Sequence, residues 1–249
     1  MTRIVSAVYG VAPGGVWSEE SIRAVRDAAA ENGLAFEVVE SVPVPEDIKL
    51  GEESLWRNLH TFLEALIPAA HEAGIRMGIH PDDPPWSMFD LPRIITNAGN
   101  LRWMFAMADD EANGLTLCTG PLGADPDNDL VGMAAEFADR IPFAHLRNIR
   151  RTGTRQFEEV GHPTLCGSID IYSVARALVT HGFDGYVRPN HGRMIWGADG
   201  RCGYGLFDRD GATYLAGLFE ALEKELRNNE KNDRNHRRRR QQPALHHGT

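Results

Sequence analysis

The chain has 249 residues, of which 42% are hydrophobic and 24% are charged, and its formal net charge is −9. This is the balance of a globular protein with a substantial core, and the acidic charge disfavours nucleic acid as a partner. Because no apolar run reaches the roughly 20 residues of a membrane span and the chain opens without a signal-peptide pattern, we expect a cytoplasmic protein that binds no membrane.

Short runs rich in Val, Ile and Phe alternate with helical patterns along the chain. The runs predict six strands, at residues 4–8, 36–40, 76–80, 115–118, 143–147 and 185–188. Helices are expected near residues 19–31, 54–73, 100–108, 130–139, 171–180 and 212–227. Alternating strands and helices are typical of βα units with a parallel sheet. A chain of this length therefore favours an α/β fold of the β/α-barrel type.

The end of the chain differs in composition from the rest. Residues 227–249 contain seven Lys or Arg against two acids, including the run 237–240. A basic segment with few apolar residues cannot bury a core of its own. The sequence thus predicts a barrel domain over residues 1–226, followed by a basic tail without regular structure at 227–249.

Polar residues stand at or just after the carboxyl ends of four predicted strands. These residues are His80, Cys118, His145 and Arg188. A β/α barrel carries its active site at this end of its strands. Any one of these residues, taken alone, would more often be a buried structural residue, but their common position predicts a functional site.

Three of these residues, His80, Cys118 and His145, offer donor atoms for a metal ion, and Asn190, two residues after Arg188, offers a fourth. Two imidazoles, a thiolate and an amide oxygen suit Mn, Fe or Zn better than Mg. The structural alternative is a core cysteine and two hydrogen-bonded histidines. The acids expected to support the histidine ligands are Asp82 and Asp83.

Several long strings of the sequence resemble those of the mannonate dehydratase family. They include IHPDDPP at 79–85, NGLTLCTG at 113–120, FAHLRN at 143–148 and VRPNHGRMIWG at 187–197. The resemblance extends over nearly all of residues 4–225. It implies an eight-stranded barrel of the xylose isomerase kind and a reaction that removes water from D-mannonate to give 2-dehydro-3-deoxy-D-gluconate. It also implies Mn²⁺ or Fe²⁺ as the cofactor.

The resemblance also implies roles for individual residues. The family's metal ligands correspond to the four donors named above. His191 and Tyr204 are the expected acid/base pair, because His191 follows the last ligand and Tyr204 lies where the family has its catalytic tyrosine. Arg147 and Arg188 are the expected ligands of the substrate carboxylate, although either arginine could instead pair with a neighbouring acid.

The chain departs from the family pattern at three points. Asn190 stands where the family has Asp, so a neutral amide replaces a metal-binding carboxylate and weaker metal binding is expected. Pro45 stands where the family usually has His. Two of the family's eight strands are absent, which leaves an incomplete barrel with exposed strand edges. We therefore expect a homo-oligomer in which another subunit completes the wall of the site, or else a degenerate copy of the enzyme.

Two other functions agree with the same sequence. One is a metal-dependent sugar isomerase or epimerase, since this fold supports many chemistries. The other is a catalytically impaired, non-enzymatic remnant, which Asn190 and the absent strands would favour. The pair His191 and Tyr204 argues for the dehydratase over the isomerase.

Overall fold

The computed structural model describes residues 3–6, 8, 11, 17–39, 51–190 and 205–241. The chain divides into two compact units, Met1–Leu50 and Gly51–Thr249. The sequence instead predicts a division after residue 226. The break between the units follows the string VPVPEDIK at 42–49.

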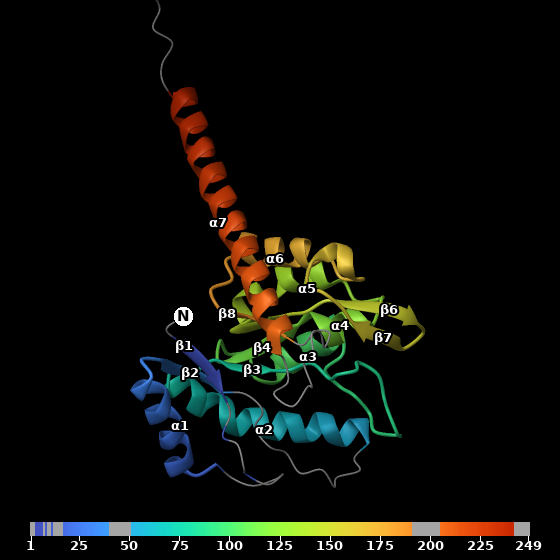
Figure 1. Ribbon diagram of the computed structural model, residues 1–249. Helices are drawn as coiled ribbons and strands as arrows, with labels where there is room; N and C mark the ends of the chain where they lie inside the picture. The colour runs from blue at the N-terminus through green and yellow to red at the C-terminus, as the bar shows by residue number, and fades with distance from the viewer. Residues whose placement is uncertain are drawn as a thin grey trace, which may run out of the picture. The chain divides into compact units, whose positions relative to one another are not determined.

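The first unit is a βαβ arrangement. Strand β1 (Arg3–Ser6) pairs in parallel with β2 (Ala35–Val39), and α1 (Glu19–Glu31) connects them in the sequence (Figure 1). The side chain of Ser18 caps α1 by accepting a hydrogen bond of 3.1 Å from the backbone N–H of Ser21. Gly33 follows the helix with φ of +70°, a conformation that glycine adopts without strain.

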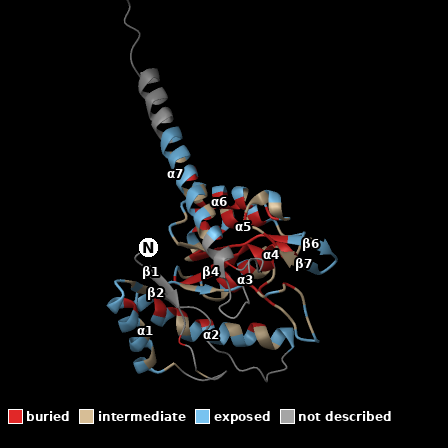
Figure 2. Cartoon of the chain, in the orientation of Figure 1, coloured by how far each residue is buried: buried red, intermediate tan, exposed pale blue. Residues whose placement is uncertain are grey.

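The second unit contains a sheet of four parallel strands in the order β3-β4-β5-β8. They are β3 (Met77–Ile79), β4 (Asn113–Cys118), β5 (Phe143–Leu146) and β8 (Tyr186–Pro189). With β1 and β2, these confirm the six predicted strands to within a few residues. Residues of β4 and β5 are buried along their whole length, whereas β3 and β8 are only partly buried (Figure 2).

Helices surround this sheet and supply most of the remaining core. They are α2 (Glu52–Glu72), α3 (Ala98–Met107), α4 (Thr119–Ala124), α5 (Leu130–Glu136), α6 (Ile171–Thr180) and α7 (Gly205–Gln241), with short 3-10 turns at Ala138–Arg140 and Thr164–Cys166. Leu115, Leu117 and Leu146 of the central strands have no exposed surface. Burying such a side chain is worth roughly 1.5–3 kcal/mol, so the core of this unit lies around β4 and β5.

A short antiparallel hairpin follows β5 and was not predicted from the sequence. It consists of β6 (Ile149–Gly153) and β7 (Gln156–Glu159), and Arg155 in its turn has φ of 55°. Four of the nine strand residues are charged, and neither strand contains the apolar run by which strands are recognised. The hairpin brings Glu159 back towards the end of β5.

The last helix begins earlier and ends later than expected. Helix α7 spans Gly205–Gln241, whereas the sequence predicts a helix near 212–227 and a tail without regular structure after it. Helical structure therefore continues over residues 227–241, which contain no Gly or Pro and six Arg, a residue that favours helices. Among the described residues, no helix is both long and apolar enough to cross a bilayer.

Candidate metal centre

Three of the predicted metal ligands come together at the carboxyl end of the sheet. His80 follows β3, Cys118 ends β4, and His145 lies in β5. Their candidate ligand atoms all lie within 4.8 Å of one another. Cys118 and His145 are register partners in neighbouring strands, so their side chains point to the same face of the sheet. The imidazole rings of His80 and His145 have centroids 5.3 Å apart.

The three ligands differ in their exposure to solvent. Cys118 is fully buried and His145 is 5% exposed, whereas His80 is exposed. The Nδ1 atom of His80 lies 2.7 Å from the carbonyl oxygen of Pro81. A carbonyl only accepts hydrogen bonds, so in neutral His80 Nδ1 carries the proton and Nε2 carries the lone pair that a metal needs.

The thiol of Cys118 has an unusual protonation equilibrium. Burial raises its pKa to about 11, although the nearby charge of Arg147 and a hydrogen bond from Asn190 act in the opposite direction. The protein alone therefore keeps this thiol protonated at neutral pH. Because a cation stabilises a thiolate strongly, metal binding here would be accompanied by release of a proton.

Asn190, the fourth predicted ligand, lies beside this group. It is 5% exposed, and its Nδ2 is 3.6 Å from the sulfur of Cys118. Asn190 follows β8, and β5 separates β8 from β4. Contact across an intervening strand requires the sheet to curl inwards at this end, as the wall of a barrel does.

Arg147 occupies the second of the two roles that the sequence left open for it. It is 2% exposed, and its guanidinium pairs with Asp83 at 2.6 Å and with Glu159 at 3.3 Å. Burial raises the pKa of Glu159, while the charge of Arg147 opposes that effect. The ion pairs therefore use both Nη atoms of the guanidinium that was expected to hold the substrate carboxylate.

The two acids expected to support the histidine ligands make other contacts. Asp82 accepts hydrogen bonds of 2.8 Å from the backbone N–H groups of Ile94 and Ile95. These bonds fix the loop that connects β3 to α3. Asp83 pairs with Arg147.

The remaining predicted site residues fall into two groups. Arg188 is the register partner of His145 and is half-buried, so it faces the same side of the sheet as the three ligands. His191 and Tyr204 lie outside the described residues.

Two residues near the ligands were missed by the sequence analysis, Thr119 and Glu159. Thr119 is fully buried, and its hydroxyl accepts a hydrogen bond of 2.9 Å from the backbone N–H of Arg147 and donates one of 2.7 Å to its carbonyl oxygen. Glu159 belongs to the hairpin that the sequence does not predict. A threonine after a strand-end cysteine was the only available signal for Thr119, and it is a weak one.

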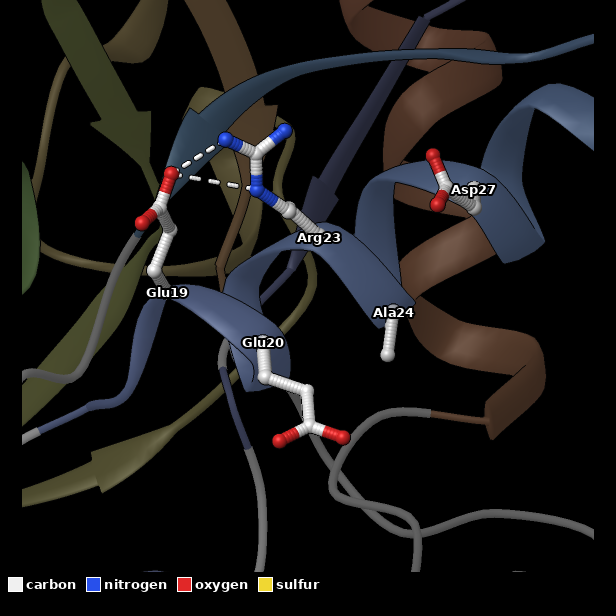
Figure 3. Close-up of a pocket in the computed structure, with 5 residues that line it drawn as sticks. All are labelled: Glu19, Glu20, Arg23, Ala24 and Asp27. Carbon is white, nitrogen blue, oxygen red and sulfur yellow. Dashed lines mark hydrogen bonds and ion pairs between the residues drawn. The ribbon is translucent and has the colours of Figure 1, made fainter.

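A surface hollow elsewhere has no connection with this chemistry. It has a volume of about 450 Å³ and lies along α1, where Arg23 pairs with Glu19 at its rim (Figure 3). Its lining is a solvated helix surface without buried donors. The group formed by His80, Cys118 and His145 is therefore the better candidate for a functional site.

A parallel sheet with such a group at the carboxyl ends of its strands defines a class, the β/α-barrel proteins that hold a metal ion at this edge. The xylose isomerase domain protein from Planctomyces limnophilus shares this fold, with a TM-score of 0.58 at 12% identity over 91% of this chain and 98% of its own. The mannonate dehydratase from Streptococcus suis serotype 2 matches with a TM-score of 0.84 at 33% identity, over 91% of this chain and 87% of its own.

The sequence comparisons define the family. The family model described as D-mannonate dehydratase (UxuA) matches residues 1–54 and 50–229. Mannonate dehydratase 2 of Halalkalibacterium halodurans is 37% identical over 319 aligned positions, which cover 89% of this chain and 92% of that protein. Mannonate dehydratase of Lactococcus lactis subsp. cremoris is 46% identical over 213 positions, which cover 84% of this chain and 55% of that protein. The chain belongs to the D-mannonate dehydratase family, and its fold is that of the xylose isomerase-like barrels.

The chain is shorter than its relatives within the matched region. The alignment of 319 positions with the H. halodurans protein exceeds the 249 residues of this chain, so that protein carries internal residues that this chain lacks. The chain spans 49% to 55% of the length of the other curated relatives. The two matches to the family model adjoin at residues 50–54.

Proposed function

We propose that this protein removes water from D-mannonate to give 2-dehydro-3-deoxy-D-gluconate, with Mn²⁺ or Fe²⁺ as its cofactor. The observation that carries the proposal is the convergence of His80, Cys118 and His145, with ligand atoms within 4.8 Å of one another, in a chain of the D-mannonate dehydratase family. The reaction belongs to the carbon–oxygen hydro-lyases.

The donor set fits a divalent transition metal. His80 offers Nε2, Cys118 offers its sulfur, and His145 offers an imidazole nitrogen, with Asn190 proposed as a fourth ligand. Nitrogen and sulfur donors favour Mn, Fe or Zn over Mg. When bound, the cation would polarise oxygens of the substrate and stabilise the negative charge that develops in the reaction.

The chain's own residues supply the other functions. We assign Arg188 to the substrate carboxylate, because it shares the face and register of His145 and a guanidinium binds a carboxylate through two hydrogen bonds. We assign His191 and Tyr204 to proton transfer, on the strength of the family resemblance. One removes the hydrogen at C2, next to the carboxylate, and the other protonates the hydroxyl that leaves C3 as water. The resulting enol then becomes the 2-keto acid.

The test is direct. Purified protein is incubated with Mn²⁺ or Fe²⁺ and D-mannonate, and formation of the 2-keto acid is measured. Metal-dependent product supports the proposal, and its complete absence from metal-loaded protein would support the remnant. For a variant that removes a ligand histidine, such as His145→Ala, His60→Ala is the matched control, because His60 is half-exposed on α2 and pairs with Glu64 of the same helix.

The isomerase alternative has weaker support. The solved epimerases that share the fold, such as L-ribulose 3-epimerase at 12% identity and a TM-score of 0.56, show a common architecture only. Incubation with D-mannonate also tests this alternative, since an isomerase or epimerase would give a product of unchanged mass and no loss of water.

The predicted assembly and location belong to the proposal as well. We infer a homo-oligomer, because this chain lacks internal residues that the H. halodurans protein has and a second subunit could replace them. We also infer a cytoplasmic location, from the sequence alone. Light scattering of the purified protein measures the oligomeric state. A monomer that is fully active would contradict the need for a second subunit.

A further inference from the structure

Arg147 lies at the meeting point of the segments that carry the metal ligands. Its own segment includes His145, two residues earlier on β5. Its guanidinium pairs with Asp83, three residues after His80, at 2.6 Å. The side chain of Arg147 is 2% exposed, whereas that of Asp83 is 31% exposed, so the guanidinium lies inside the protein and the carboxylate at its edge.

The segment after Cys118 packs against the same arginine. A Cβ atom placed on Gly120 would lie 1.6 Å from Nε of Arg147, so only glycine leaves room for the side chain there. The neighbouring Thr119 forms two hydrogen bonds, of 2.9 and 2.7 Å, with the backbone N–H and carbonyl of Arg147. Residues close in sequence to His80 and Cys118 therefore contact Arg147, and Arg147 itself follows His145 by two positions.

The hairpin adds a fourth segment. Glu159 at the end of β7 pairs with Nη1 of Arg147 at 3.3 Å, while Asp83 takes Nη2. Because each Nη atom pairs with a different carboxylate, the guanidinium is held in one orientation. With both acids ionised, the three groups carry one net negative charge beside a candidate cation site.

We propose that Arg147 is a positioning residue that holds the three ligand-bearing segments in place through Asp83 and Glu159, and that it does not bind the substrate carboxylate. Glu159 is then a determinant of metal binding, although it lies on a hairpin that carries no ligand. The inference rests on the metal site of the proposed function. The sequence suggested Arg147 and Arg188 for substrate binding, and under this inference Arg147 no longer has that role. Arg188 remains for that role.

The experiment uses Co²⁺ as a spectroscopic probe of the metal-free protein. The variants are Glu159→Gln and Arg147→Lys, with Glu158→Gln as the control, because Glu158 lies on the same strand but pairs with the exposed Arg150. Titration is followed by the absorption of the Co²⁺–thiolate bond, which reports on Cys118 directly. Partners that orient metal ligands typically contribute 10- to 100-fold to metal affinity.

We expect Glu159→Gln and Arg147→Lys each to weaken Co²⁺ binding by roughly tenfold or more and to shift the visible bands, since the ligands lose their fixed orientation. Glu158→Gln should leave both unchanged. Thermal melting without metal shows that each protein is folded. Glu159→Gln keeps the side-chain volume and is 27% exposed, so it remains a test even if Arg147→Lys does not fold.

Activity at saturating metal separates the two roles of Arg147. A positioning residue leaves KM for D-mannonate within about twofold of the parent, whereas loss of a substrate-binding arginine raises KM strongly. Unchanged Co²⁺ affinity in Glu159→Gln, or a large rise in KM with unchanged Co²⁺ affinity in Arg147→Lys, would overturn the proposal. A parent protein that binds no Co²⁺ also overturns it. Weakened Co²⁺ binding in the variants of a protein that does not dehydrate D-mannonate would support the positioning role and reject the proposed reaction.

Discussion

The central and edge strands of the four-stranded sheet hold their metal-ligand candidates in different ways. Cys118 and His145 belong to β4 and β5, whose residues are buried throughout. His80 follows the edge strand β3 and is exposed. Central strands are held by neighbours on both sides, whereas His80 is fixed through the loop that follows it. In that loop Asp82 accepts hydrogen bonds from Ile94 and Ile95, and Asp83 pairs with Arg147.

This difference separates a rigid half of the site from an adjustable half. The buried pair cannot move without disturbing the core, because close-packed interiors tolerate little displacement. His80 is exposed, so we expect its displacement to disturb the core less. We therefore expect the two halves to respond differently to substitution.

The largest effect is expected from His145→Ala. Loss of one imidazole removes a direct bond to the metal and leaves a cavity in the core, so metal binding and dehydratase activity should fall below detection. His80→Ala should weaken metal binding less, because a water molecule can replace an exposed ligand. Metal content after dialysis measures both. Full occupancy in His145→Ala would reject the assigned site, and equal losses in the two variants would contradict the division into halves.

Gly120→Ala tests the rigid half without altering any ligand. The added methyl group would collide with the guanidinium of Arg147, whose ion pairs prevent it from moving away, and overpacking of this kind typically costs 1–3 kcal/mol or more. Gly217→Ala is the control, because nothing lies within 4 Å of a Cβ at this helical position. The control should be neutral or slightly stabilising, since alanine favours helix. Urea unfolding measures both free energies, and similar values for the two variants would show that the segment after Cys118 is not rigid.

The sequence predicted the rigid half of the site better than its surroundings. Cys118 and His145 were recognisable because apolar strands with polar residues at their carboxyl ends are a pattern that barrel chemistry requires. The role of Arg147 could not be chosen in advance, because one of its partners, Glu159, lies on a hairpin that has no apolar run to predict it. The fold followed from alternating strands and helices, but the length of α7 did not. Its last turns lack the apolar periodicity that marks a packed helix.

A buried histidine away from the ligands sharpens the comparison. His162 is 2% exposed and packs against Gly211 of α7. Burial lowers its pKa from 6.5 to about 4. The unfolded chain therefore binds the proton first as the pH falls. The stability that comes from keeping His162 neutral is fully present above about pH 6.5 and is lost between about pH 6.5 and 4.

We expect this loss to reach about 2 kcal/mol at pH 5, from the linkage between pKa shift and unfolding free energy. His162→Gln should remove that part of the pH dependence. Unfolding in urea at pH 7.5 and pH 5, without metal, measures the difference for both proteins. If parent and variant lose the same stability between the two pH values, the imidazole is not held neutral by the fold.

The smallest expected effect is also the one with a defined sign, and it concerns Asn190. This residue is buried beside Cys118, with Nδ2 at 3.6 Å from the sulfur. Asn190→Asp keeps the size of the side chain but adds a negative charge. In the metal-free protein that charge is buried next to a thiol, and the charge of Arg147 that acts on this thiol is already paired with Asp83 and Glu159, so the thermal midpoint should fall. With Mn²⁺ present, the carboxylate faces a divalent cation, and metal affinity should rise by roughly tenfold, or about 1.4 kcal/mol.

Melting curves with and without Mn²⁺ measure both effects of Asn190→Asp. Asn128→Asp provides a comparison, because Asn128 donates hydrogen bonds to backbone carbonyls away from the ligand group. A variant that melts lower in both conditions and binds Mn²⁺ no better than the parent would show that Asn190 packs beside the site without contributing a ligand.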